Sequence, residues 1–190
     1  MFGSRDAIVR FDMSEYIEKH TVSLLVGAPP GYVAHEEGGK LTEAVRRKPY
    51  SIVLFDEIEK AHADIFNILL QVMDEGRLTD RQGRVVDFRN TIIIMTSNVG
   101  TRQLNEFGSG IGFNADEIDE KQTEHILTKA LNRTFPPEFV NRLDNIVVFH
   151  PLNDEALAQI LTIEIHPLEL RLETMGYKLQ LTKKTKDLLL

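Results

Sequence analysis

The stretch Ser51-Ile52-Val53-Leu54-Phe55-Asp56-Glu57 decides the fold. Ser51 to Phe55 form a short apolar run rich in β-branched residues, which is typical of a strand buried on both faces in a parallel sheet. Asp56 and Glu57 then lie at the carboxyl end of the strand, where open α/β sheets bind ligands. Asp56 can hold Mg²⁺, and Glu57 can polarise a water for attack on a phosphate. The alternative is a strand that ends in a solvated acidic turn.

The composition is ordinary for a soluble globular protein, and it excludes several functions. The chain has 190 residues, of which 42% are hydrophobic and 27% are charged. A net charge of −7 argues against a general binder of nucleic acid or anionic membranes. The absence of Cys excludes disulfides and thiolate chemistry. No apolar run approaches the roughly 18 residues of a membrane helix, and residues 1–10 lack the core of a signal peptide. We therefore expect a cytoplasmic protein.

The hydrophobic pattern predicts further elements on either side of this strand. Strands are expected at residues 7–11, 91–98, 145–149 and 177–181. Helices are expected at residues 41–47, 65–73 and 120–131, as one helix or two at 154–175, and from 183 onward. Residues 79–84 are expected to form a turn between two short strands. Gly76 fits a helix stop, Pro167 an interruption or kink, and residues 151–153 a domain boundary.

Three further features outside the strands point to function. Asn98 ends the strand at 91–98 and lands beside Asp56 if the two strands are parallel neighbours; otherwise it is a cap or turn residue. Tyr32 occupies the tip of a Pro/Gly loop, where it either grips another molecule or folds back on its own domain. Ile111-Gly112-Phe113 is an apolar tripeptide within a Gly-rich loop, and it either docks on a partner or packs into the domain.

Several stretches of this chain, in this order, resemble a known family. They are Asp12-Met13-Ser14-Glu15-Tyr16, Gly27-Ala28-Pro29-Pro30-Gly31-Tyr32-Val33, Leu54-Phe55-Asp56-Glu57-Ile58-Glu59-Lys60-Ala61-His62, Asp74-Glu75-Gly76-Arg77-Leu78-Thr79-Asp80, Met95-Thr96-Ser97-Asn98 and Glu138-Phe139-Val140-Asn141-Arg142-Leu143-Asp144. The chain is similar to the second ATPase module of the double-ring Clp unfoldases, in the AAA+ superfamily. The similarity extends over almost all of the sequence.

The resemblance implies a fold and a set of catalytic residues. The fold is a parallel sheet sandwiched by helices, with the large subdomain at residues 1–150 and the truncated start of a small helical subdomain at 151–190. Asp56 and Glu57 match the Walker B motif, for Mg²⁺ coordination and water activation. Asn98 matches sensor 1, which positions the attacking water beside ATP. Arg142 matches the arginine finger that reaches into the nucleotide site of a neighbouring subunit.

The resemblance also implies partners. The pore loop that pushes substrate polypeptide through a homo-hexameric ring matches Gly31, Tyr32 and Val33, and a second pore loop matches residues 80–84. Ile111, Gly112 and Phe113 match the loop by which the branch that includes ClpC docks on the ClpP peptidase. The partners expected are therefore this peptidase, unfolded or tagged proteins and adaptor proteins. The alternatives are a disaggregase module like that of ClpB, without a peptidase, and a non-hydrolysing binding module.

The sequence departs from the family at the phosphate-binding loop. The 190 residues contain no G-x-x-x-x-G-K-[ST], the loop whose amides and lysine hold the nucleotide phosphates. The family places this loop just before Met1. We therefore expect these residues alone to bind ATP weakly and to be inactive by themselves. Two smaller departures are Leu24, where an arginine is expected, and Ala34, where the pore loop usually has glycine.

Overall fold

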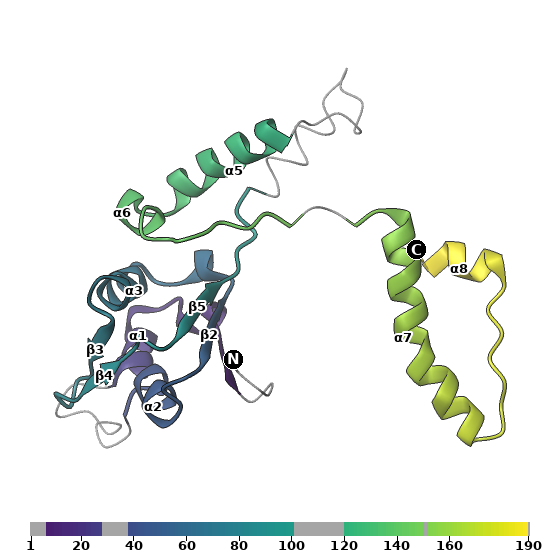
Figure 1. The fold of residues 1–190 in the computed structure, drawn as a ribbon, viewed down its shortest axis with the longest axis horizontal. Coiled ribbons are helices and arrows are strands. Elements are labelled where there is room, and N and C mark those ends of the chain that lie inside the picture. Colours follow the sequence, from purple (N-terminus) through teal and green to yellow (C-terminus); the bar gives the residue numbers. More distant parts are fainter. Residues whose placement is uncertain (1–6, 28–37, 101–119, 150–151, 190) are drawn as a thin grey trace. The chain divides into compact units, whose positions relative to one another are not determined.

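The computed structural model describes residues 7–27, 38–100, 120–149 and 152–189 (Figure 1). The chain divides into two units, Met1–Ile146 and Val147–Leu190. The first unit contains the sheet and the candidate site. Each unit is described by itself below.

A three-stranded parallel sheet forms the centre of the first unit. Its strands are β1 (Ile8–Asp12), β2 (Ile52–Asp56) and β5 (Ile92–Met95), in the order β1-β2-β5. The register pairs Asp12 with Asp56 and Phe55 with Met95, so the three carboxyl ends lie at one edge. The predicted α/β fold with a parallel sheet is confirmed.

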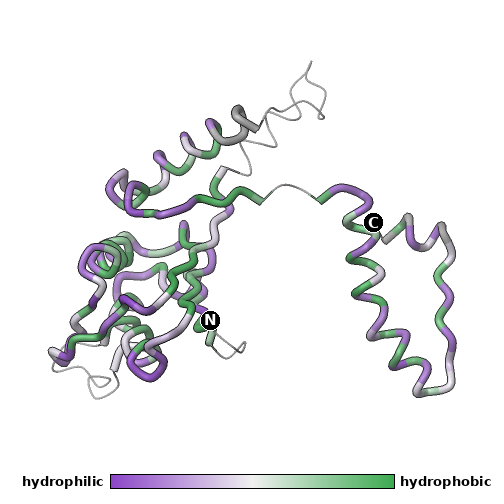
Figure 2. The backbone as a smooth tube through the Cα atoms, viewed as in Figure 1, coloured by the Kyte–Doolittle hydropathy of each residue, from purple (hydrophilic) through white to green (hydrophobic). Residues whose placement is uncertain are grey.

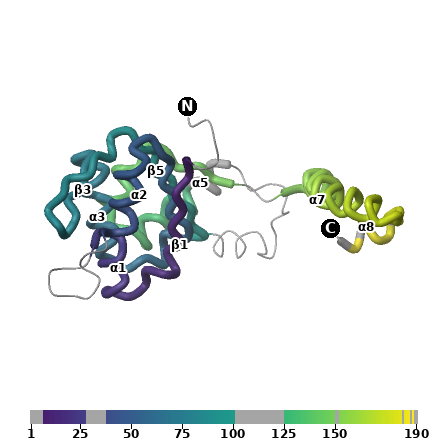
Figure 3. The backbone as a smooth tube through the Cα atoms, turned by 90° about the horizontal axis from the view of Figure 1, so that it is seen from below, coloured from purple at the N-terminus to yellow at the C-terminus, as the bar shows by residue number. Residues whose placement is uncertain are grey.

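Three helices cover one side of this sheet. Figures 1 and 3 both show α1 (Lys19–Val26), α2 (Lys40–Arg47) and α3 (Ala63–Glu75) on the same side of the strands. Val53 and Phe55 of β2 are buried in the core, and Ile58 joins them from the short 3-10 helix η3 (Ile58–Lys60). A second short 3-10 helix, η2 (Met13–Tyr16), follows β1 and buries Met13 and Tyr16.

The expectation that the central strands are buried on both faces is wrong for the described residues. Ile8, Ile92 and Ile94 are 47%, 45% and 43% exposed, and burial along β2 alternates from residue to residue. The reason is that α1, α2 and α3 gather on one face of the sheet. A short apolar run is compatible with either arrangement, because its composition does not say which layers surround it.

Helix α3 carries the predicted apolar stripe and ends at the predicted glycine. Ile65, Phe66, Leu69 and Val72 are buried along it. Gly76 adopts φ 64°, and its backbone N–H donates to the carbonyl of Val72, which closes the helix with a left-handed cap. The chain then turns directly into the antiparallel hairpin of β3 (Arg77–Thr79) and β4 (Val85–Asp87). The predicted turn between two short strands is confirmed.

An aromatic cluster packs the next helices onto α3. Helix α5 (Glu120–Thr134) is followed by the short α6 (Pro137–Val140). Phe66 of α3 lies 5.6 Å from Phe135 and 5.0 Å from Phe139, measured between ring centroids in edge-to-face geometry. Such pairs add about 0.5–1.5 kcal/mol beyond the burial of their area. The end of α5 and helix α6 are therefore packed against α3.

Two predicted strands do not form. Residues 145–149 and 177–181 are not strands, and Val147 and Phe149 are 74% and 92% exposed. Figure 2 shows hydrophobic residues in the extended segment that precedes residue 150. Composition alone does not make a strand, because its backbone needs a hydrogen-bonded neighbour. Within the described parts of the chain, neither segment is paired in a sheet.

The second unit contains two helices. Helix α7 (Asp154–Thr174) begins at Asn153, whose side chain accepts a hydrogen bond from the Ala156 amide at 2.9 Å, and it continues through Pro167. Helix α8 (Lys183–Leu189) ends the described chain. Helix α7 buries none of its described residues. Its assignment to the start of a small subdomain stays a prediction. No helix among the described residues has the length and apolarity needed to span a membrane.

Candidate functional site

The candidate site lies where β2 and β5 end side by side. Because Phe55 is in register with Met95, the residues that follow them leave the sheet at the same point. Thr96 joins the two strand ends: its backbone N–H donates to the carbonyl of Phe55 at 2.9 Å, and its carbonyl accepts from Ile58 at 3.0 Å. The polar groups after the two strands therefore form one cluster, as the sequence predicts for neighbouring parallel strands.

Asp56 is an ionised carboxylate with two side-chain partners. One carboxylate oxygen accepts a hydrogen bond from the hydroxyl of Thr96, and the other forms an ion pair with Arg10 of β1. The hydrogen bond from Thr96, followed by that from Arg10, lowers the pKa of Asp56, although burial opposes the shift. The Arg10 side chain is 62% exposed, so its guanidinium can be replaced by another cation.

Glu57 has an unusual backbone conformation. Its φ of 55° and ψ of 51° lie in the left-handed region, and it is the sole non-glycine residue with positive φ in the described chain. Such a conformation typically costs on the order of 1–3 kcal/mol and persists where neighbours enforce it. Here the hydroxyl of Thr96 accepts from the Glu57 amide at 3.1 Å. The Glu57 side chain reaches Lys60, with 2.6 Å between Oε2 and Nζ. Asp56 and Glu57 therefore contact different cations.

Asn98 is held at the site through its backbone. It is exposed, and its amide N–H donates to Oε1 of Glu59 at 3.1 Å. The second oxygen of Glu59 is buried and has no hydrogen-bond partner among the described residues. The structure thus brings Thr96, rather than Asn98, into direct contact with Asp56. Sequence reasoning missed Thr96, although it follows the same predicted strand whose end led to Asn98.

Arg142 lies away from this cluster, at the other end of α3. Its Nε is 2.8 Å from Oδ1 of Asp74 in the last turn of that helix. Asp74 is eleven residues from the first residue of α3, Ala63, a separation of about 17 Å at 1.5 Å per residue. Glu57 precedes that first turn. In the described chain, then, Arg142 makes an ion pair within its own domain and does not join Asp56 and Glu57.

The predicted loop residues Gly31, Tyr32 and Val33 lie outside the described residues, as do Ile111, Gly112 and Phe113. The residues on either side of the first loop are described. Gly27 and Gly38 pair as an isolated antiparallel bridge, and the turn at residues 80–84 lies next to them.

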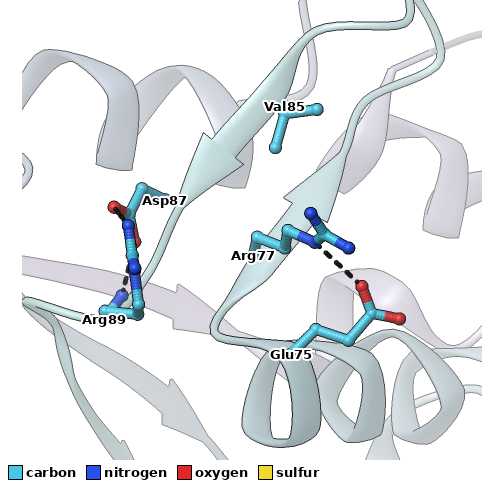
Figure 4. Close-up of a pocket in the computed structure, with 5 residues that line it drawn as sticks. All are labelled: Glu75, Arg77, Val85, Asp87 and Arg89. Carbon is cyan, nitrogen blue, oxygen red and sulfur yellow. Dashed lines mark hydrogen bonds and ion pairs between the residues drawn. The ribbon is translucent and has the colours of Figure 1, made fainter.

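One depression on the hairpin does not belong to this site. It has a volume of about 410 Å³ and is lined by Glu75, Arg77, Val85, Asp87 and Arg89 (Figure 4). Its charges already pair with one another, at 3.0 Å for Arg77–Glu75 and 2.7 Å for Arg89–Asp87. These exposed pairs form a solvated charged face.

The oxygen atoms at the end of β2 suit a magnesium ion better than a metal ion whose ligands all come from protein side chains. Asp56 supplies carboxylate oxygens and Thr96 a hydroxyl, and Mg²⁺ usually takes one or two carboxylates and completes its shell with waters and phosphates. Across the described residues, no group of three His, Cys, Asp or Glu side chains could enclose a metal. The donor set therefore suits a cation that arrives with a phosphate ligand.

A parallel sheet covered by helices, with an Asp-Glu pair at the end of its central strand, is an architecture of nucleotide-dependent enzymes. Comparison with known proteins assigns the class: residues 1–146 match the AAA domain of the Cdc48 subfamily, and the chain belongs to this family.

The particular relatives are named as ATP-binding subunits of Clp proteases. The chain is 56% identical over 188 residues to the "ATP-dependent Clp protease ATP-binding subunit ClpC" of Staphylococcus aureus, in strains USA300 and NCTC 8325. It is 54% identical over 188 residues to the protein of that name in Staphylococcus epidermidis. Each match covers 98% of this chain and 23% of the relative. The chain therefore spans about a quarter of the length of these relatives.

Proposed function

We propose that these residues are part of an ATP-driven protein unfoldase that threads polypeptides through a ring pore and delivers them to a ClpP-type peptidase. The observation that carries the proposal is the cluster of Asp56, Glu57 and Thr96 at adjoining strand ends, in a chain 56% identical to ClpC subunits. The name of those relatives includes both ATP binding and a Clp protease.

In this proposal Asp56 holds Mg²⁺, and Glu57 acts as the base that orients and deprotonates water. Mg²⁺ bound to ATP neutralises charge on the phosphates. The low pKa of Asp56 keeps its carboxylate ionised and ready to bind a cation. The Asp56 and Glu57 side chains contact different partners, Arg10 and Lys60, so that one residue can bind metal while the next contacts water. Asn98 follows on the neighbouring strand, where it helps to position that water.

Arg142 completes the nucleotide site of a neighbouring copy in a homo-hexamer. Its separation from Glu57 along α3 supports action in another subunit. A guanidinium delivered in trans stabilises charge on the transferred phosphoryl group and typically contributes a factor of about 10³–10⁵ in rate. The test is to mix Arg142→Ala subunits with Glu57→Gln subunits. A trans finger predicts that the mixed rings recover hydrolysis, because some sites then have both residues; no recovery would contradict it.

The substrate is gripped by the loop that contains Gly31, Tyr32 and Val33, and residues 80–84 form a second pore loop. A tyrosine supplies a large contact area that tolerates many substrate sequences. Tyr32→Ala in the full-length protein should reduce substrate unfolding far more than ATP hydrolysis. Loss of hydrolysis with unfolding retained would assign Tyr32 a structural role.

Delivery to the peptidase depends on Ile111, Gly112 and Phe113. Two large apolar side chains on a Gly-rich tether suit docking into hydrophobic pockets, and weak contacts repeated around a ring reinforce one another through effective concentration. We expect Phe113→Ala to abolish peptidase association while ATP hydrolysis continues. Normal association would favour the alternative of a disaggregase without a peptidase.

The experiment that tests the whole proposal is degradation of a folded, tagged substrate. The full-length protein with a ClpP-type peptidase and adaptors should degrade it only when ATP and Mg²⁺ are supplied. Nucleotide-independent binding without degradation would instead favour a non-hydrolysing binding module.

A further inference from the structure

A charged cluster joins helix α2 to the hairpin turn. Asp80 is 4% exposed, and its carboxylate accepts hydrogen bonds from the amides of Gln82 and Arg84 at 3.0 and 2.8 Å. Its second oxygen accepts from Nε of Arg84 at 2.7 Å. Nη2 of Arg84 extends to Oε1 of Glu43 on α2, at 2.6 Å. Arg84 thus bridges a buried carboxylate in the turn and a second one on the helix.

The ion pair between Glu43 and Arg84 is enclosed more than a typical surface pair. The Glu43 side chain is 18% exposed and that of Arg84 40%. A hydrogen bond from Arg46, and then the one from Arg84, lowers the pKa of Glu43, while burial opposes the shift. Charged hydrogen bonds of this kind are stronger and more directional than neutral ones.

The residue that follows the first loop (residues 28–37), Gly38, packs closely against the Glu43–Arg84 ion pair. A Cβ atom at Gly38 would lie 2.5 Å from Oε1 of Glu43 and 2.7 Å from Nη2 of Arg84. A Cβ atom at Gly39 would lie 2.2 Å from the Leu25 carbonyl oxygen, so the chain before and after residues 28–37 is packed backbone to backbone. These close approaches need residues without side chains.

The hairpin turn also contacts the residues that precede the first loop. The amide of Arg81 donates to the carbonyl of Val26 at 3.3 Å, and Gly27 bridges to Gly38. The chain on either side of residues 28–37 and the turn at residues 80–84 therefore meet at one common base, which we call the loop base and define as Gly27, Gly38, Glu43, Asp80 and Arg84.

We propose that Glu43 and Arg84 are positioning residues that hold the described ends of the first loop, Gly27 and Gly38, and the turn at residues 80–84 together, so that these parts of the loop base move as one body. The proposal rests on the proposed function, because the coupling matters if Tyr32 and the turn both act on substrate. Asp80 fixes the orientation of the Arg84 guanidinium, which in turn forms the ion pair with Glu43. Gly38 packs against this Glu43–Arg84 ion pair. A displacement of the turn at residues 80–84 is therefore expected to displace Gly27 and Gly38 as well, and the reverse.

Two variants that break the same contact by different means test the proposal in the full-length assembled protein. Glu43→Gln removes the charge and keeps the shape. Gly38→Ala keeps both charges and displaces their tips, and Gly38 is not among the glycines with positive φ, so its backbone can accept alanine. The matched control is Glu75→Gln, which removes the same charge from an exposed pair with Arg77 at 3.0 Å.

The measured quantity is the amount of substrate unfolded per ATP hydrolysed. We expect both variants to lower this ratio by about tenfold, the lower end of what the loss of one charged hydrogen bond corresponds to. Hydrolysis without substrate should stay within about twofold of the unmodified protein, and Glu75→Gln should not alter the ratio. The double variant should be no worse than the more severe single one, because both act on one contact.

An unchanged ratio in both variants would overturn the proposal, and so would an equal reduction of the ratio by Glu75→Gln. It would also be overturned if lower hydrolysis and a lower melting temperature of the variants accounted for the whole loss of substrate unfolding. Tyr32→Ala separates this proposal from the proposed function. If Tyr32→Ala leaves unfolding intact, the function of the loop itself is wrong. If Tyr32→Ala abolishes unfolding while Glu43→Gln has no effect, only the coupling is wrong.

Discussion

The two clusters of charge in the first unit differ in how their carboxylates are held. At the end of β2, Asp56 is paired with Arg10, whose side chain is 62% exposed, and Glu57 with Lys60, whose side chain is 46% exposed. At the loop base, the Asp80 side chain is 2% exposed and accepts from two backbone amides and one guanidinium. The first cluster has partners that a ligand can replace, and the second is closed.

The proposed function accounts for this difference. A site that binds Mg²⁺ and a phosphate must keep its carboxylates ionised while leaving their partners exchangeable, so exposure is required. A structural carboxylate is stable in the interior only when its hydrogen-bonding capacity is met by fixed groups. In the proposed function, Asp therefore serves binding at residue 56 and architecture at residue 80.

The largest effect is expected at Glu57. In the full-length protein, Glu57→Gln should leave nucleotide binding intact and reduce hydrolysis in this ring by about 10²–10⁴-fold, because an amide keeps the shape and cannot act as a base. Turnover should be measured with the other ring disabled. Unchanged turnover would show that Glu57 is an acidic turn residue. The cluster at the end of β2 would then have no catalytic role to contrast with the loop base.

The next largest effect is on stability at the loop base. Asp80→Asn should lower the free energy of opening of the hairpin by about 2–3 kcal/mol, because it leaves the Arg84 charge without its buried partner. Hydrogen exchange of the Gln82 and Arg84 amides measures this opening. The control is Asp87→Asn on the same hairpin, where the side chain is 47% exposed. Equal protection in the two variants would contradict the contrast between closed and open clusters.

A smaller effect is expected for the ion pair of Arg142. Its partner Asp74 is 40% exposed, so the pair resembles the open cluster. Asp74→Asn should change hydrolysis by no more than about fivefold, in keeping with the modest value of exposed ion pairs. The change should vanish in an Arg142→Ala background. Glu75→Gln, one residue further, serves as the control, and a larger or additive loss would show that Asp74 acts independently of Arg142.

The smallest effect is a pH dependence on the hairpin surface. Side-chain and backbone hydrogen bonds from Arg89 lower the pKa of Asp87 to about 2, from an ordinary 3.8. Since the folded pKa is the lower one, the stabilisation is present above about pH 4 and is lost as pH falls towards 2. A carboxyl titration by NMR should show this pKa return towards 3.8 in Arg89→Ala. An unshifted titration would show that the ion pair does not persist in solution.

Local patterns were sufficient for much of the fold. The apolar run before Asp56, the stripe of α3 and the stop at Gly76 are properties of neighbouring residues, so strand, helix and cap are all predictable from sequence. The same local logic failed for residues 145–149 and 177–181, which have strand composition and no paired strand in the described chain. Pairing depends on a second segment, and composition does not supply one.

The sequence by itself determined that Asp56 and Glu57 end a strand and that the chain is an AAA domain of Clp type, because these features depend on residue order and spacing. Only the tertiary structure decided that Thr96 contacts Asp56, that Arg142 pairs with Asp74 and that Gly38 rests on Glu43 and Arg84. The Thr96–Asp56 and Arg84–Glu43 partners are 40 and 41 residues apart in the chain. Contacts over such separations form only when whole elements pack together, and no local pattern encodes them.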